Sequence, residues 1–294
     1  MQSPSSDEVC LSMIQRELAV LNQKVTKLGT INSFFMKMQT EGKEGRSSDR
    51  SSSISISIDT LNSLLIVLWT LTGERRNMKE VAGLGDVILE QVPVLIQTIF
   101  EQLAIRLHKR LLSTCELTIL QSTAGVMGNL SSVPEGVVGV RVRCEETVLT
   151  RYETILIHIN TILKNGSILT NQQTLDILLW CLENYAYSQE GREKLLQLQV
   201  WRVLCVSLFR PFLQHELSLS EQGFLSILSI FKSVASISPE SKTRYAAAFQ
   251  QYATSLLSTR GRIDFADPLI SRNSASLQEL FSLLSSVASK QTKP

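Results

Sequence analysis

The sequence predicts an all-α protein, and three observations support this class. Leucine is abundant, with 44 in a chain of 294 residues. The 14 glycines and 7 prolines make up 21 of 294 residues, about 7%, where an average protein has roughly 12%. A β-sandwich or barrel needs turn residues about every 8–12 positions, so this composition disfavours both. Leucine-rich segments also recur along the chain, which predicts a stack of similar helical units.

The first predicted unit, residues 1–38, contains an amphipathic helix over residues 8–28. Its apolar residues alternate spacings of three and four, the a/d pattern of a heptad repeat: Leu11, Ile14, Leu18, Leu21, Val25 and Leu28. Ser6 and Asp7 are candidate N-caps, and Gly29 is a candidate stop. Two interpretations are open: the seam forms a short coiled coil between copies, or it docks the helix on the rest of the chain.

The next unit, residues 39–58, is rich in serine and almost free of large apolar side chains. This composition predicts a disordered linker. Residues 59–290 then form the predicted helical-repeat domain. Longer connections are expected over residues 131–143 and 259–274, and a proline is expected at the first turn of a helix that starts at Pro93. Helices are predicted near 59–72, 77–91, 93–113, 115–130, 145–164, 171–187, 192–213, 220–236, 240–258 and 275–289.

An internal repeat indicates the architecture. Gly73, Asn129 and Asn184 lie 56 and 55 residues apart, each near the end of a predicted leucine-rich helix. The aligned segments are residues 67–73, 124–130 and 179–185, with a weaker fourth copy at 230–235. A single unit of this kind cannot bury its apolar face alone, whereas stacked units share a continuous core. Trp69 and Trp180 fall at equivalent positions, so we predict that they pack between helices, as does Trp201.

One stretch resembles an armadillo repeat. Residues 174–208 contain LWCLENYA, which matches the family's ALWALxNLA-type helix, followed by GREKL, which matches its Asn/Gly-Arg restart. Residues 123–132 are a poorer match, and the spacings of 55 and 56 exceed the roughly forty residues of an armadillo unit. The resemblance implies an irregular armadillo/HEAT-like α-solenoid that follows the N-terminal amphipathic helix.

The resemblance also implies a partner-binding surface. In armadillo proteins the third helix of each repeat lines a groove, and an Asn on it grips the backbone of an extended peptide while a neighbouring Trp packs beside it. Asn184 matches this position because it lies four residues after Trp180, and Asn129 matches more weakly. Gly73 replaces the Asn in the first unit. The alternative is that Asn184 caps the end of its helix.

No pattern indicates an enzyme, a metal site or a bound cofactor. His108, His158 and His215 lack zinc-site spacing, and the chain contains neither a GxSxG elbow nor a GxxxxGK[ST] loop. The cysteines are five in number and show no CxxC pair. We therefore expect reduced, structural thiols, with Cys115, Cys181 and Cys205 buried in leucine-rich helices.

Charge and hydropathy limit the partners. The chain has 29 Lys and Arg against 27 Asp and Glu, a net charge of +2 and a pI near 8.3. This balance argues against direct nucleic-acid binding, for which a domain pI above about 9 is typical. The N-terminus lacks a signal-peptide pattern, and no apolar run reaches the length of a membrane span. We expect an intracellular scaffold or adaptor whose partners are proteins. The alternative is an accessory factor in DNA repair or meiotic recombination within a larger assembly.

Overall fold

The computed structural model describes residues 58–73, 85–132, 147–169 and 171–288, and all their regular secondary structure is helical. The heptad seam of residues 11–28 and nearly all of the serine-rich segment 39–58 lie outside the described residues. The long helices are α3 (Ile58–Gly73), α5 (Gly85–Leu107), α6 (Thr114–Ser132), α8 (Thr147–Leu163), α10 (Gln172–Tyr185), α14 (Glu221–Ala235), α16 (Ala246–Leu257) and α18 (Ser274–Ala288). Shorter elements are α9 (Gly166–Leu169), α11 (Gln189–Gln197), α12 (Val200–Val203), the π-helical turn η1 (Leu204–Phe209), α13 (Arg210–Leu213), α15 (Pro239–Arg244), η2 (Arg260–Arg262) and α17 (Pro268–Arg272).

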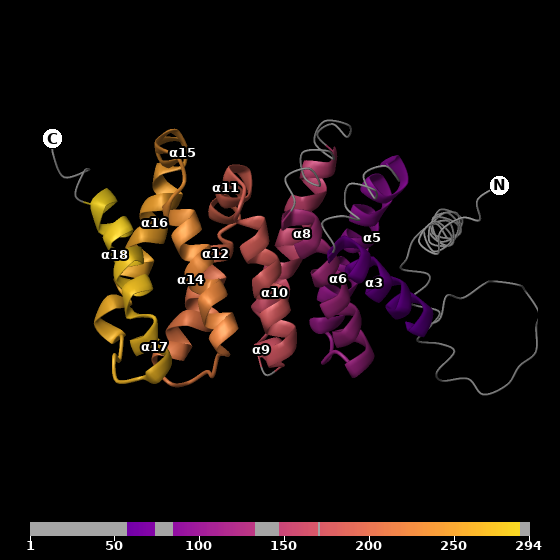
Figure 1. Cartoon of the computed structure of the whole chain (residues 1–294), viewed down its shortest axis with the longest axis horizontal. Helices are drawn as coiled ribbons and strands as arrows, with labels where there is room; N and C mark the ends of the chain where they lie inside the picture. The colour runs from indigo at the N-terminus through magenta and orange to yellow at the C-terminus, as the bar shows by residue number, and fades with distance from the viewer. Residues whose placement is uncertain (1–57, 74–84, 133–146, 170, 289–294) are drawn as a thin grey trace, which may run out of the picture.

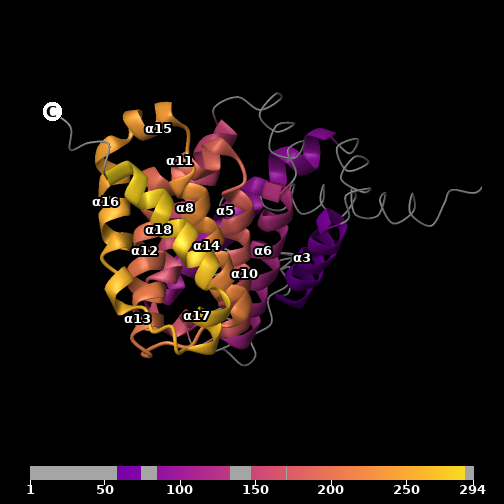
Figure 2. The same cartoon turned by 60° about the vertical axis from the view of Figure 1, so that its left-hand side comes forward.

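Successive long helices alternate between two rows. The first row is α3, α6, α10, α14 and α18, in which each helix packs against the next. The second row contains α5, α8, α12 and α16, again with neighbours in contact. Figure 1 shows the helices side by side along the long axis of the molecule from α3 to α18, and the turned view in Figure 2 shows the first row in the same order.

Neighbouring helices of the first row run in the same direction. In the first half of α6, the amide of Gln121 donates to the hydroxyl of Thr174 near the start of α10, at 2.8 Å. Ser220, the N-cap of α14, donates to Asp176 in the first half of α10, at 2.7 Å. Parallel neighbours require that the chain returns through the second row after each first-row helix. This connectivity explains why the repeated segments 67–73, 124–130, 179–185 and 230–235 all fall in the first row.

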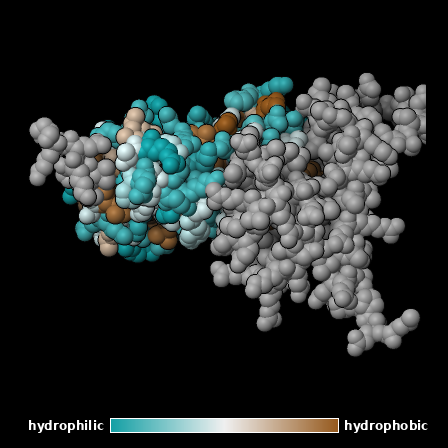
Figure 3. Space-filling model, turned by 90° about the horizontal axis from the view of Figure 1, so that it is seen from above, coloured by the Kyte–Doolittle hydropathy of each residue, from teal (hydrophilic) through white to brown (hydrophobic). Residues whose placement is uncertain are grey.

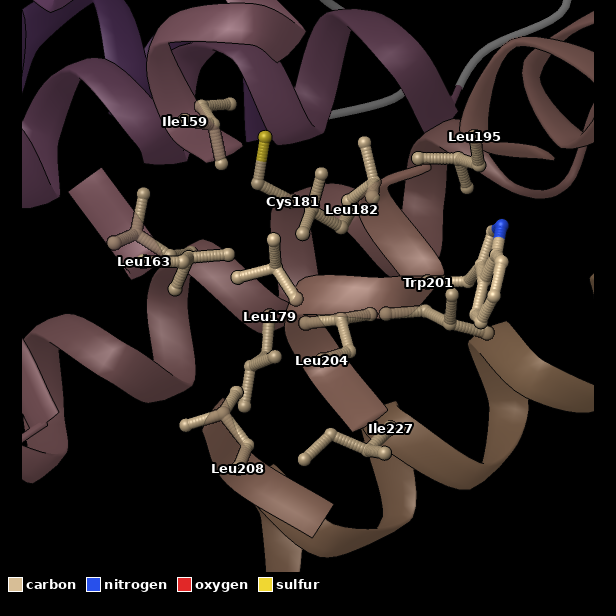
Figure 4. Close-up of a cluster of buried hydrophobic side chains, with 14 of the residues drawn as sticks. Ile159, Leu163, Leu179, Cys181, Leu182, Leu195, Trp201, Leu204, Leu208 and Ile227 are labelled. Atoms are coloured by element: carbon tan, nitrogen blue, oxygen red, sulfur yellow. The ribbon is translucent and has the colours of Figure 1, made fainter. Parts of the chain in front are cut away.

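The core lies between the rows. Leu65, Phe100, Leu179, Leu204 and Phe231, from five different helical segments, have no exposed surface. Figure 4 shows how α8, α10, α11, α12, η1 and α14 contribute side chains to one such cluster. Burying large apolar side chains is the main stabilising contribution in a fold of this kind, at about 1.5–3 kcal/mol for each.

The helix boundaries predicted from the sequence are wrong at three places. Pro93 does not start a helix but lies inside α5, so the two helices expected at 77–91 and 93–113 are one helix. Proline removes one helical hydrogen bond, and the burial of Ile96, Ile99 and Phe100 after it offsets that cost. Gln199, with a left-handed φ of 54°, divides the helix expected at 192–213. The helix expected at 240–258 is likewise divided, at Tyr245.

The prediction that the cysteines are buried is correct for Cys181 and Cys205 and wrong for Cys115. Cys181 and Cys205 are buried, and burial raises the pKa of the Cys181 thiol to about 12. Cys115 is exposed because it lies in the first turn of α6, on the side that faces solvent. Cys10 and Cys144 lie outside the described residues.

A buried carboxylate fixes the start of α6. Glu116 has a relative exposure of 3%, and its two oxygens accept hydrogen bonds from Arg106 (2.6 Å) and Arg110 (2.7 and 2.8 Å). The backbone N–H and the hydroxyl of Ser113 donate to the same carboxylate, at 2.9 and 3.0 Å. Burial by itself would raise the pKa of Glu116, but the hydrogen bonds from Arg110, Ser113 and Arg106 lower this pKa to about 2.

Candidate binding groove

A groove of about 510 Å³ crosses the first row, and we name it the row groove. Its lining is mainly apolar and comes from four helices: Trp69 and Thr70 of α3, Asn129 of α6, Asp176, Ile177 and Trp180 of α10, and Gln222 of α14. The exposed apolar side chains of Ile66 and Leu225 lie one helical turn from Trp69 and from Gln222. Trp180 and Asn129, two of the three residues predicted to bind a partner, therefore meet in one groove.

The two tryptophans lie against glycines of the helix between them. A Cβ added to Gly125 would lie 2.2 Å from Cε2 of Trp69, and one added to Gly128 would lie 2.4 Å from Cζ3 of Trp180. Only glycine at both positions lets the rings lie directly against the backbone of α6. Trp69 and Trp180 are consequently held in place while part of each ring stays exposed to the groove. Trp201, by contrast, is fully buried, with its ring centroid 5.4 Å from that of Tyr252.

Asn129 holds two sides of the row groove together. Its amide nitrogen donates to the backbone carbonyl of Trp69 at 2.9 Å, which links α6 to the last turn of α3. The side chain is 7% exposed, so most of it serves this contact. Asn129 thus positions Trp69 and contributes only a small polar patch to the groove surface.

Asn184 is buried and does not line the row groove. Its relative exposure is 6%, and its amide nitrogen has no hydrogen-bond partner among the residues that the structure describes. The C-cap at the end of α10 is Ala186, whose backbone N–H donates to the carbonyls of Leu182 and Glu183. The start of the following helix is capped by Ser188, whose hydroxyl accepts from the N–H of Gly191 at 2.9 Å. The partner-binding role expected for Asn184 stays a prediction.

Two carboxylates lie on the groove side of α10. Oδ1 of Asp176 accepts hydrogen bonds from Gln172 (2.9 Å) and Ser220 (2.7 Å). Oε2 of Glu183 accepts from Ser226 at 2.7 Å. All three donors are neutral, and among the described residues neither carboxylate is paired with a Lys or Arg.

The described residues include no group of three or more His, Cys, Asp and Glu that could hold a metal ion. The thiol of Cys181 and the hydroxyl of Tyr252 have raised pKa values, but burial in the core causes both shifts, and the Tyr252 hydroxyl donates to the carbonyl of Phe231. In the part of the chain that is described, no helix is long and apolar enough to cross a membrane.

A second cavity of about 530 Å³ lies at the α18 end of the molecule. One of its walls is the segment that begins with η2, and the other is α18. Phe265, which is 52% exposed, and Arg260 line one side, while Gln278, Ser282 and Ser285 of α18 line the other. The lining of this second cavity is more polar than that of the row groove. Seen from above, in Figure 3, the coloured surface is mainly hydrophilic with hydrophobic residues in small groups.

The sequence reasoning missed Asp176, Ile177, Thr70 and Gln222, because nothing in their local patterns marks a site. The signal that could have identified the groove is a pair of glycines in the second unit. Gly125 aligns with Trp69 and Trp180 of the neighbouring units, and Gly128 aligns with Thr72 and Glu183. Comparison with known proteins gives no further guide: no protein-family model matches the chain, and no curated protein matches it.

Asn129→Ala and Asn184→Ala are expected to differ in stability. Asn129→Ala removes the buried hydrogen bond from the Asn129 amide to the carbonyl of Trp69, so we expect a loss of about 1–2 kcal/mol in the free energy of unfolding. Asn184→Ala removes an amide nitrogen that makes no hydrogen bond to a described residue, so the loss in the free energy of unfolding should be clearly smaller. Chemical denaturation of the two variants measures the difference. A larger loss for Asn184→Ala would show that its amide has a partner in solution.

Proposed function

We propose that this chain is a non-enzymatic scaffold, an irregular armadillo/HEAT-like α-solenoid that holds a segment of a partner protein in the row groove. The single observation that carries the proposal is the pair of tryptophans, Trp69 and Trp180, both fixed against α6 and both partly exposed in one groove. Tryptophan is enriched among the residues that contribute most to binding at protein interfaces. A side chain held in place before binding loses little conformational entropy on binding, which favours affinity.

The shape and extent of the surface support the same function. The groove spans four helices of the first row, and Ile66 and Leu225, 45% and 37% exposed, extend its apolar surface on two sides. A continuous exposed apolar surface with a polar rim is typical of an interaction site. The helix of a partner or an extended peptide would lie across the row, with an apolar side chain between the two tryptophans. The alternative role in DNA repair or meiotic recombination stays a prediction.

Filling the groove tests the proposal. Gln222 lines the groove and is exposed, whereas Gln250 is exposed on α16 of the second row. Both side chains donate weakly to a hydroxyl four residues later, Ser226 and Thr254 respectively, at 3.4 and 3.5 Å. Gln222→Trp and Gln250→Trp are thus matched substitutions, and only the first obstructs the groove.

We expect affinity purification of the full chain to recover a polypeptide in stoichiometric yield. Gln250→Trp should retain it, and Gln222→Trp should lose at least about tenfold in affinity, equivalent to about 1.4 kcal/mol. Mass spectrometry identifies the partner, and thermal denaturation checks that both variants are folded. Equal recovery with both variants would exclude the row groove as the binding site.

A further inference from the structure

Charged residues are distributed very unevenly along the first row. Its five helices contain one cationic residue, Lys232, against six carboxylates: Asp59, Glu116, Asp176, Glu183, Glu221 and Glu279. The net charge of these helices is therefore negative, although the whole chain carries +2. Acidic residues therefore outnumber basic residues in these five helices.

Among the described side chains, three of these carboxylates have cationic partners. Glu116 is paired with Arg106 and Arg110, and Glu279 with Lys232 at 2.5 Å. Glu221 lies 3.5 Å from Arg272.

Asp176 and Glu183 differ from these three carboxylates, because among the described residues they accept hydrogen bonds from neutral groups alone. The groove residues themselves include Asp176 but no Lys or Arg.

The carboxylates of Asp176 and Glu183 share a helix face with the groove tryptophan, Trp180. Asp176 and Glu183 are seven residues apart, which is two helical turns, and Trp180 lies between them. The ring face of tryptophan attracts a cationic group, and a nearby carboxylate adds an ionic contact. Both carboxylates already accept hydrogen bonds from Ser220 and Ser226, which hold them at the side of α10 that faces α14.

We propose that the row groove selects a segment of a partner protein in which an apolar side chain is flanked by Lys or Arg. This inference rests on the proposed function and adds the chemistry of the partner. The apolar side chain occupies the space between Trp69 and Trp180, and the basic residue reaches Asp176 or Glu183. An acidic segment would be repelled by the carboxylates of Asp176 and Glu183, which have no cationic partner among the described residues.

A displayed peptide library tests this selection. The library contains random 12-residue peptides together with overlapping 12-residue peptides that cover all 294 residues of this chain. It is selected on the full chain and counter-selected on Gln222→Trp, so that only groove-dependent peptides remain. We expect these peptides to be enriched in Lys and Arg next to Leu, Ile, Phe or Trp.

Charge is then removed without changing the hydrogen bonds. Asp176→Asn and Glu183→Gln keep an oxygen that can accept from Ser220 and from Ser226. We expect the double variant to bind the best peptide about tenfold more weakly for each carboxylate that it contacts, and with a smaller dependence on salt. The matched control is Asp264→Asn with Glu216→Gln, two exposed carboxylates that do not line the groove, which should leave affinity unchanged.

The results of the selection test the charge preference and the groove function separately. Enrichment of Asp and Glu would overturn the charge preference and leave the groove function intact, as would equal affinity of the wild type and the Asp176/Glu183 variant. Recovery of no groove-dependent peptide would overturn both. If the strongest binder is a peptide from this chain itself, the occupant is its own segment or a second copy, and the assignment to a partner protein is wrong.

Discussion

Gly191→Ala is expected to lower the free energy of unfolding by about 3 kcal/mol, the upper part of the range for overpacking in a buried site. A Cβ at this position would lie 1.9 Å from the backbone carbonyl oxygen of Tyr185, the last residue of α10. A backbone atom cannot move aside as a flexible side chain can, so the connection between α10 and α11 has to shift. That shift would also disturb the hydrogen bond from the Gly191 N–H to Ser188.

Equilibrium unfolding in urea measures this loss. The control is Gly261→Ala in η2, where an added Cβ has no atom within 4 Å. We expect the control to stay within about 0.5 kcal/mol of the wild type, as for most surface substitutions. If the two variants are equally stable, the close contact between Gly191 and Tyr185 does not exist in solution.

Glu116→Gln is expected to cost about 3 kcal/mol at pH 7, because it removes the negative charge that pairs with the largely buried guanidinium of Arg106 and with Arg110. The pKa of Glu116 in the folded chain, about 2, lies below its ordinary value of 4.5. The carboxylate therefore stabilises the fold fully above about pH 4.5, and this contribution is lost as the pH falls from 4.5 towards 2.

The pH dependence separates this effect from a simple packing defect. The difference in unfolding free energy between the wild type and Glu116→Gln should be constant from pH 7 to about pH 5 and should shrink below that. Glu279→Gln is the control, since Glu279 is exposed in its pair with Lys232 and such pairs contribute at most about 1 kcal/mol. A difference that stays constant down to pH 3 would mean that Glu116 is not held as an ionised group.

Leucine periodicity and the scarcity of glycine and proline were enough to predict an all-helical chain, and the described residues confirm it. The predicted helix boundaries were wrong where a tertiary contact outweighed the local conformational preference of the sequence. Pro93 lies inside α5 because the residues after it are buried, and Gln199 breaks a helix without being glycine or proline. Neither effect is visible in a window of sequence, because both depend on which helices pack together.

The candidate site was predictable in part for a similar reason. Trp180 and Asn129 could be identified from the repeat, and both line the row groove. The roles of Asp176 and Gln222 depend on the contact between α10 and α14, which are separated in the chain by four elements, α11, α12, η1 and α13. The prediction that Trp69 and Trp180 pack between helices describes only half of their surroundings, because each ring also faces the groove.

The most direct test of the central claim is site-specific photo-crosslinking of the full chain to the partner that it purifies with. A photo-reactive phenylalanine analogue at position 222 lies in the row groove, and the same analogue at position 250 lies on the second row. The proposed function predicts a crosslinked product from position 222 that is absent or much weaker from position 250. A product from position 250 with none from position 222 would contradict the proposal, because the partner would then occupy the opposite row of helices.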